Sequence, residues 1–300
     1  MSAAHRATVL AAFGRQFWIR NENGDERSAV TRGRNTDVVA GDRVEWRDLG
    51  GGQAVIERVL PRANLLRRSD LHRTKTLAAN LDAAAVVISG TPPFSEELLL
   101  RVLIAAEREG IECRLVATKA DVAGSIESIE PRLAVYEALG YPVHRIAAKD
   151  RPAQAIAGLS PVLAGRSTLL LGQSGMGKST LVNLLAPGAA MATRAISEAL
   201  QTGRHTTTFC RAFDLPASGR LIDSPGFQTF GLAHLSASEI EHGMREFQPL
   251  LGRCRYHNCS HRHEPGCAIR AAVGAGGAGG IDPRRHALYV QIRDQAPAPR

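Results

Sequence analysis

Residues 167–186 read STLLLGQSGMGKSTLVNLLA. The apolar run at the start predicts a buried strand, and the run TLVNLL at the end predicts a helix. Between them, Gly172 to Ser179 fit the pattern G-x-x-x-x-G-K-[ST] in the strand–loop–helix setting that it requires. Glycines in such a loop let backbone N–H groups wrap around phosphate oxygens at the N-terminus of a helix. The stretch predicts a nucleotide phosphate loop on an α/β sheet.

Two side chains of this loop have predicted roles. Lys178 is expected to reach the β- and γ-phosphates, and Ser179 to ligate Mg²⁺. The chain contains 33 Arg but only 4 Lys, so a Lys at this position indicates a need for a compact ammonium that Arg cannot replace. The residues of the loop predicted to bind nucleotide are Gly172, Gln173, Ser174, Gly175, Met176, Gly177, Lys178, Ser179 and Thr180.

Two stretches downstream complete a predicted phosphate and magnesium site. In LIDSPG (221–226), Asp223 ends an apolar strand, where a Mg²⁺-associated carboxylate is expected, and Gly226 can offer its N–H to the γ-phosphate. GRHTTT (203–208) lies between this stretch and the phosphate loop. We expect one threonine there to complete the Mg²⁺ shell: Thr207, or else Thr206 or Thr208.

Upstream, ATKAD (117–121) follows the apolar strand CRLVA. A carboxylate such as Asp121 can accept hydrogen bonds from guanine N1–H and its exocyclic amine, a donor pair that adenine lacks. Lys119 is expected to lie along the base, and Thr118 stands where Asn is commoner. A lone T-K-x-D is usually a surface loop, but on the same sheet as a phosphate loop it indicates a guanine reader. The loop AAK (147–149) is expected to add backbone contacts to the base.

The order of these elements is unusual. In a Ras-type GTPase the phosphate loop comes first and the base reader near the end, whereas here the base reader comes first. All the parts are present but rotated, which predicts a circularly permuted GTPase core. The DSPG segment then leads directly into the C-terminal region, so a change at the γ-phosphate could act on that region through the backbone.

The rest of the chain predicts a multidomain protein. In residues 1–65, short alternating runs separated by NENGDE and DLGGGQ are typical of a small all-β barrel. The basic segment 61–76 is expected to be a linker or an RNA-contacting arm, and we assign the linker to residues 66–80. Strands and helices alternate over 81–235, which predicts a mostly parallel sheet and the permuted GTPase domain. Residues 236–300 contain a cluster of cysteine and histidine residues, a Gly-rich stretch and a predicted final helix with Asp282 as its cap and Pro283 at its first position.

Charge is distributed unevenly. Residues 1–75 hold 14 Lys and Arg against 9 Asp and Glu, and residues 250–300 hold 8 against 3, while the region between is near neutral. Two basic ends suggest contact with a polyanion, although a generally basic proteome explains them equally well. The chain contains no apolar run of about 20 residues and no signal-peptide core, so we expect a cytoplasmic protein without membrane contact.

A cluster of cysteine and histidine residues lies at CRYHNCSHRHEPGC (254–267). In a chain otherwise poor in cysteine, it indicates zinc rather than disulfides. The spacing favours all three cysteines as ligands and leaves the choice of histidine open. Cys113 and Cys210 lie in apolar strands and are expected to be core residues.

Together, GQSGMGKST, GRHTTT, DSPGF and the C-x4-C-x-H-x5-C cluster resemble one family, the circularly permuted, ribosome small-subunit-dependent GTPases of bacteria. The resemblance covers essentially the whole chain. It implies an N-terminal OB-fold that binds RNA over residues 1–65, a permuted GTPase domain, and a helical domain with a Gly-rich insert over residues 236–300. The zinc ligands that it implies are Cys254, Cys259, His261 and Cys267. It further implies late maturation of the 30S ribosomal subunit, contact with its rRNA, and GTP hydrolysis stimulated by that subunit.

The residue that positions the attacking water is not in its usual place. Ras-type enzymes use a glutamine directly after the DxxG glycine, whereas this chain has Phe227 there. His205 is the predicted catalytic residue because it precedes the switch threonines and matches the family's histidine. Two alternatives stay open: an ATP-dependent P-loop kinase, and an RNA-binding protein whose nucleotide site only holds the fold. We expect a monomer.

Overall fold

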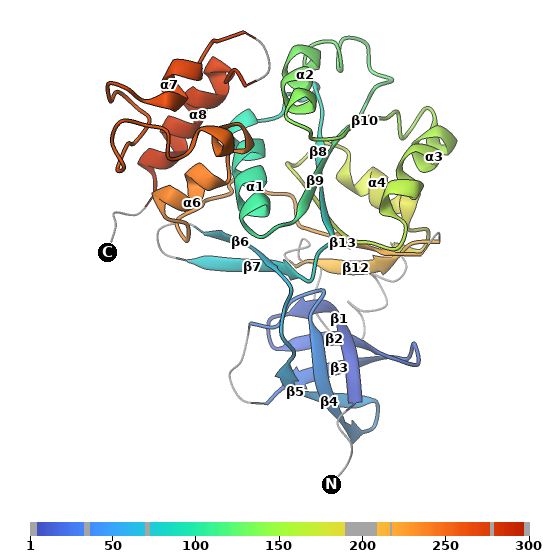
Figure 1. Cartoon of the computed structure of the whole chain (residues 1–300). Helices are drawn as coiled ribbons and strands as arrows, with labels where there is room; N and C mark the ends of the chain where they lie inside the picture. Colours follow the sequence, from blue (N-terminus) through green and yellow to red (C-terminus); the bar gives the residue numbers. More distant parts are fainter. Residues whose placement is uncertain are drawn as a thin grey trace.

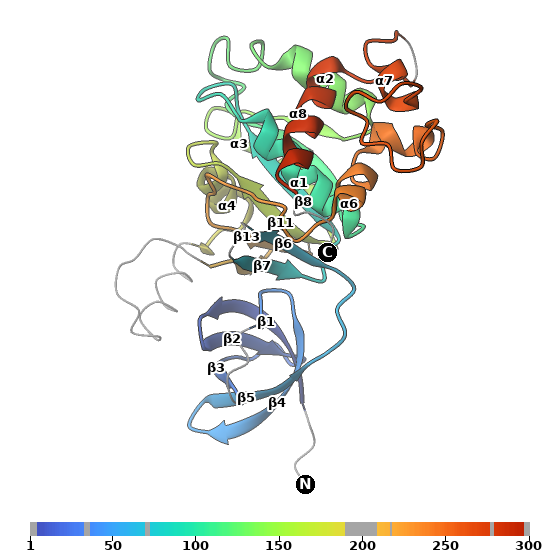
Figure 2. The same cartoon turned by 90° about the vertical axis from the view of Figure 1, so that its left-hand side faces the viewer.

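The computed structural model describes residues 5–32, 37–69, 73–189, 209–216, 218–276 and 279–296. A small barrel, a central sheet covered by helices and a group of C-terminal helices follow one another along the chain (Figure 1). The barrel lies at one end of the molecule, and the C-terminal helices pack beside α1 of the central domain (Figure 2).

The barrel is a closed five-stranded sheet. Its strands are β1 (His5–Phe13), β2 (Gln16–Asn21), β3 (Glu26–Thr31), β4 (Arg43–Gly50) and β5 (Gln53–Val59). They follow the order β1-β2-β3-β5-β4, and β4 pairs back onto β1 to close the barrel. Only the β3–β5 pair is parallel. Alternating residues such as Val9, Phe17, Ile19 and Val44 are fully buried inside, so the alternation in the sequence corresponds to the inner face of an OB-type barrel.

The central sheet is mostly parallel, as predicted. Its strands are β8 (Ala83–Ile88), β9 (Glu112–Ala117), β10 (Val143–Arg145), β11 (Ser167–Gly172), β12 (Arg211–Asp214) and β13 (Arg220–Asp223), in the order β10-β9-β8-β11-β13-β12. Only β12 is antiparallel to its neighbour β13. The chain moves outward from β8 to β10 and then returns to place β11 beside β8. Nucleotides bind at such a reversal of strand order, beyond the carboxyl ends of the strands.

Helices cover both faces of this sheet. They are α1 (Glu96–Arg108), α2 (Glu130–Ala138), α3 (Pro152–Leu163) and α4 (Lys178–Leu185). Figure 1 shows the sheet close to edge-on, with α1 and α2 on one side and α3 and α4 on the other. Helix α1 begins directly after Ser95, whose side chain accepts a hydrogen bond from the backbone N–H of Leu98.

The segment expected as a linker contains a hairpin. Strands β6 (Leu65–Ser69) and β7 (Thr74–Ala79) pair with each other, and Leu66 and Ala78 are fully buried. The backbone N–H of Ser69 donates to the carbonyl of Gly231 at 2.9 Å. The barrel also adjoins the central sheet directly, because β1 pairs with β12 at Ala11 and Arg211. Residues 66–69 and 73–80 therefore contribute packed structure at the junction, and the domain boundaries at 65, 80 and 235 remain proposals.

The C-terminal region is helical. Its elements are α6 (Ala237–His242), the 3-10 helix η1 (Arg245–Leu250), α7 (Ala268–Ala272) and α8 (Pro283–Asp294). Asp282 caps α8, with Pro283 at its first position, as predicted. The guanidinium of Arg285 pairs with the carboxylate of Glu246 at 2.6 Å, and both side chains are almost completely buried. None of the helices in the described ranges is both long and apolar enough to cross a bilayer.

Candidate nucleotide site and metal centre

The phosphate loop connects β11 to α4 through two glycines in left-handed backbone. Gly175 has φ 81° and Gly177 has φ 92°, values that side chains with a Cβ rarely adopt. Gly172 lies so close to β8 that a Cβ there would be 2.8 Å from the carbonyl oxygen of Val87. Gly175 and Gly177 are therefore required by the backbone conformation of the loop, and Gly172 by the close packing of β11 against β8.

Lys178 and Asp223 meet at the centre of the site. The ammonium lies 2.5 Å from the Asp223 carboxylate, and Lys178 is only 9% exposed. Burial raises the pKa of the Asp223 carboxyl, and the charge of Lys178 opposes this shift. The Lys178 ammonium, predicted to bind phosphate, and the Asp223 carboxylate, predicted to associate with Mg²⁺, thus lie side by side at the carboxyl ends of β11 and β13. Ser179 and Thr180 lie in the first turn of α4 next to them.

The DSPG segment lies against the phosphate loop. A Cβ on Gly226 would be 3.5 Å from the backbone nitrogen of Ser174, so the two backbones approach each other closely. Phe227 is 5% exposed and packs edge-on to Phe230, with ring centroids 5.6 Å apart. The residue after the DxxG glycine therefore faces the core and cannot position a water molecule, while Gln228 is exposed.

The predicted base reader is fastened to the phosphate loop. The Thr118 hydroxyl donates to the carbonyl of Met176 at 2.5 Å, and the Lys119 ammonium donates to the carbonyl of Gly175 at 2.7 Å. Lys119 adopts φ 60° to make this contact. Asp121 follows in an exposed turn, and the backbone N–H of Ala120 donates to the carbonyl of Ile146 at 3.1 Å. The segment 118–121, the segment at Ile146 and the phosphate loop thus lie together. Thr118 bonds to the phosphate loop although Asn is commoner at its position.

One contributing loop is absent from the sequence-based prediction. Residues 89–95 leave the end of β8 beside the phosphate loop, and the backbone N–H of Ser95 donates to the Gln173 side chain at 2.7 Å. The carbonyl of Thr91 accepts a second bond from the Lys119 ammonium at 2.7 Å. The sequence could have indicated this loop by its position: it follows β8, the strand at which the order of the sheet reverses, and ligands bind at such positions.

Four predicted residues lie outside the described residues: His205, Thr206, Thr207 and Thr208. The assignments of the catalytic histidine and of the threonine on Mg²⁺ therefore remain predictions.

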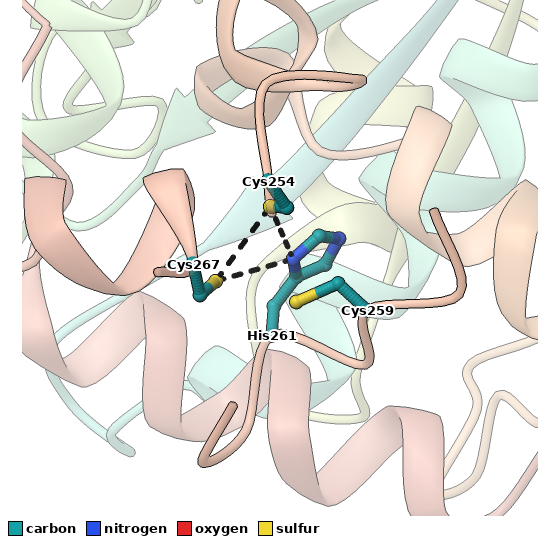
Figure 3. Close-up of side chains that lie close together, drawn as sticks. All are labelled: Cys254, Cys259, His261 and Cys267. Carbon is teal, nitrogen blue, oxygen red and sulfur yellow. Dashed lines mark hydrogen bonds between the residues drawn. The ribbon is translucent and has the colours of Figure 1, made fainter. Parts of the chain in front are cut away.

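The second site is the cluster predicted to hold zinc. The ligand atoms of Cys254, Cys259, His261 and Cys267 all lie within 4.8 Å of one another. His261 Nδ1 is 3.5 Å from the Cys254 sulfur and 3.4 Å from the Cys267 sulfur, and these two sulfurs are 3.8 Å apart (Figure 3). Tetrahedral zinc with ordinary bond lengths separates its ligands by about 3.5–3.8 Å. The residues therefore fit a closed zinc site.

The protein structure selects one histidine of three. His261 is 4% exposed, whereas His257 and His263 are exposed. Burial lowers the pKa of the His261 imidazole, which favours the neutral ring that coordinates metals. Its other nitrogen, Nε2, lies 3.8 Å from the Glu241 carboxylate, the kind of partner that orients a metal-bound imidazole. The resemblance named this histidine, and the structure places it with the three cysteines.

Fold and site together define a circularly permuted P-loop GTPase, because the base reader precedes the phosphate loop along the chain and contacts it in space. Residues 59–233 match the RsgA GTPase family. The chain belongs to this family, and its enzymatic activity is GTP hydrolysis.

The relatives span nearly the whole chain. The small ribosomal subunit biogenesis GTPase RsgA of Burkholderia pseudomallei strain K96243 is 50% identical over 289 residues, which cover 96% of this chain and 91% of that protein. The protein of the same description from Paraburkholderia phymatum is 48% identical over 293 residues, with 97% and 92% covered.

Two solved structures share the fold. YjeQ from Thermotoga maritima superposes with a TM-score of 0.72 at 24% identity, covering 98% of both chains. YloQ, described as a circularly permuted GTPase, gives a TM-score of 0.69 at 22% identity, covering 99% of this chain and 98% of its own.

Proposed function

We propose that the protein binds the 30S ribosomal subunit and its rRNA in the cytoplasm, and hydrolyses GTP to GDP during late maturation of that subunit. On this proposal the subunit stimulates turnover, and the protein acts as a monomer without membrane contact. The description of the relatives as small ribosomal subunit biogenesis GTPases supports the process. The basic N-terminal 75 residues support the contact with RNA.

The observation that carries the nucleotide assignment is the bond from the Lys119 ammonium to the carbonyl of Gly175. It links the segment that we expect to read guanine to the phosphate loop, which supports Asp121 as the residue that accepts hydrogen bonds from the base. This arrangement argues against an ATP-dependent kinase, since a carboxylate has no donor pair to accept from on adenine.

The roles of the side chains follow from their positions. Lys178 would neutralise the β- and γ-phosphates from the base of the loop, while Ser179, Asp223 and one threonine, Thr207 in our first choice, would hold Mg²⁺. When bound, Mg²⁺ would supply positive charge at the phosphate oxygens. Phe227 cannot orient water, so we assign that role to His205, as the family resemblance implies.

The zinc site serves structure in this proposal. Three thiolates and one imidazole fill a tetrahedral shell and leave no open position for a substrate. Zinc would therefore stabilise the C-terminal helices rather than take part in hydrolysis.

Multiple-turnover GTP hydrolysis with and without 30S subunits tests the function. We expect slow turnover by the free protein and a marked increase with the subunit; equal rates would contradict stimulation, and absent turnover in both would favour a purely structural nucleotide site. Competition between GTP and ATP separates the GTPase from a kinase. Asp121→Ala should abolish the preference for GTP, while Asp150→Ala, which removes another exposed carboxylate, serves as the control.

A further inference from the structure

The segment that follows the DSPG motif is held by a strand from a distant part of the chain. Residues 224–235, all of them within the described ranges, form no helix or strand of their own. At Leu232, however, the segment forms a parallel bridge with Ser69, the last residue of β6. The backbone N–H of Ser69 donates to the carbonyl of Gly231 at 2.9 Å. The segment is thus added to the edge of the β6–β7 hairpin.

The Ser69 side chain makes two further contacts with this segment. Its hydroxyl oxygen accepts a hydrogen bond from the backbone N–H of His234 at 2.8 Å and lies 2.6 Å from Nδ1 of the His234 ring. Burial lowers the pKa of the His234 imidazole, and the charge of Arg67 lowers it further. A neutral ring follows, and its Nδ1 can accept the proton of the hydroxyl. Since Ser69 is only 3% exposed, little water competes for either bond.

The hairpin that holds the segment is itself anchored on its other side. The backbone N–H of Ala79, in β7, donates to the carbonyl of Ala40 in the barrel at 3.0 Å, and the Asn80 side chain donates to the carbonyl of Gly41 at 2.9 Å. The two backbones lie so close that a Cβ on Gly41 would be 2.1 Å from the carbonyl oxygen of Ala79. Figures 1 and 2 both place β7 between the barrel and α1. The edge of β6 is therefore a fixed support.

The other end of the segment lies at the nucleotide site. Gly226 is predicted to offer its N–H to the γ-phosphate, and the next residue, Phe227, donates its backbone N–H to the carbonyl of Gly172 in the phosphate loop at 3.4 Å. The carbonyl of Thr229 already accepts a hydrogen bond from the Arg68 guanidinium of β6 at 3.0 Å. So short a stretch of chain between the two attachments limits how far Gly226 can move. In GTPases, this segment is ordered by the γ-phosphate and released on hydrolysis.

We propose that Ser69 is a positioning residue for GTP, because it holds residues 229–234 on β6 and thereby keeps the Gly226 N–H in place for the γ-phosphate. The inference goes beyond the proposed function and rests on the predicted contact of Gly226. Ser69 touches no nucleotide in this assignment and acts through the backbone of the DSPG segment. GDP has no γ-phosphate, so loss of the Ser69 hydroxyl weakens the binding of GTP and not that of GDP. A general loss of stability would weaken both.

The test measures the affinity of the full chain for fluorescent methylanthraniloyl derivatives of GDP and of a non-hydrolysable GTP analogue. Ser69→Ala should lower the affinity for the GTP analogue by about three- to tenfold, the effect expected from lost hydrogen bonds of this kind, and should leave the affinity for GDP unchanged. Ser69→Thr keeps the hydroxyl and should restore the affinity for the GTP analogue. Thr74→Ala is the matched control, since Thr74 is exposed and pairs with Ser69 across the hairpin.

Hydrogen exchange of the same complexes locates the effect. If the γ-phosphate orders the segment on β6, the GTP analogue should slow exchange at the backbone N–H groups of Ser69 and His234 relative to GDP, because the two contacts stabilise each other. Ser69→Ala should remove this difference at His234. Equal exchange of wild-type His234 with both nucleotides would contradict the assignment.

Gly226→Ala separates this inference from the contact on which it rests. The added methyl has room, with its nearest neighbour 3.5 Å away, but it hinders the approach of Gly226 to the γ-phosphate. If only Gly226→Ala lowers the affinity for the GTP analogue, the role of Ser69 is overturned. If neither variant lowers it, the predicted contact fails and the role of Ser69 fails with it. An equal loss of affinity for both nucleotides in Ser69→Ala would also overturn the role. None of these measurements uses 30S subunits, so the proposed function is tested independently.

Discussion

The nucleotide site and the zinc site are built in opposite ways. The nucleotide site joins segments around residues 91, 119, 175 and 223, which the buried central sheet brings together. The zinc site takes all its ligands from 14 consecutive positions, 254–267, in a loop with few apolar side chains. A sheet with a large core holds its loops in place without a ligand, whereas a short polar loop needs the metal for its folding energy. The first site should therefore persist without its ligand, and the second should not.

Among the changes that test this comparison, we expect removal of zinc to have the largest effect on stability. Structural zinc contributes on the order of 10 kcal/mol to the folding of small domains, so Cys259→Ser or chelation should unfold the C-terminal helices and make them sensitive to protease. The nucleotide site should still bind GTP. Circular dichroism, limited proteolysis and GTP titration measure the two parts separately. His257→Ala changes an exposed residue of the same loop and is the control; an unchanged proteolytic pattern after chelation would contradict the prediction.

Loss of the buried ion pair is expected to be the next largest effect. Glu246→Ala leaves the Arg285 guanidinium buried without its carboxylate, which should cost about 3–5 kcal/mol. Because this pair lies in the C-terminal region, the loss should lower the stability of that region even with zinc bound. Chemical denaturation in the presence of zinc measures it. Asp294→Ala, which breaks the exposed ion pair with Arg262 in the same region, provides the comparison; equal losses in both variants would show that burial does not decide the cost.

In the nucleotide site, one substitution should lower turnover without changing binding. His205→Ala should keep GTP and 30S binding but lower stimulated turnover by about 10²-fold, because positioned groups of this kind contribute effects of that size. Steady-state hydrolysis with saturating 30S subunits measures the change. Gln228→Ala tests the only nearby glutamine of the DSPG segment, and it should leave turnover close to that of the wild type. Full turnover in the His205 variant would leave the water-positioning group unassigned.

The smallest effect concerns the start of the C-terminal region. Ser236 and Glu239 form a reciprocal cap on α6, so Ser236→Ala should cost about 1 kcal/mol. Ser238→Ala removes a hydroxyl from the same helix without removing the cap. Thermal denaturation of both variants should show a larger decrease for Ser236→Ala. The difference between the two variants measures a contribution to the stability of the C-terminal region that does not depend on zinc.

The sequence predicted those features that depend on local residue types. The phosphate loop follows from its glycines, and the starts of α1 and α8 follow from Ser95 and Asp282, because caps and left-handed glycines are local requirements. The order of motifs predicted the permuted domain.

Features that depend on distant contacts could not be predicted in the same way. The β6–β7 hairpin lies in a stretch whose charged residues resemble a linker, and its burial arises from contacts with α1 and Gly231. The bond from Ser95 to Gln173 joins residues 78 positions apart. His261 could be chosen among three histidines only by resemblance, since burial, which distinguishes it, is a tertiary property.

The pairing of β12 with β1 should also limit self-association. β12 is the outermost strand of the central sheet, and an uncovered outermost strand offers unpaired N–H and carbonyl groups to other chains. The closed barrel, which has no free edge of its own, lies on this strand and links to it through the ion pair of Arg20 with Asp214. A shortened chain that lacks the barrel would expose the strand. It should aggregate on that account, whatever the barrel contributes to binding.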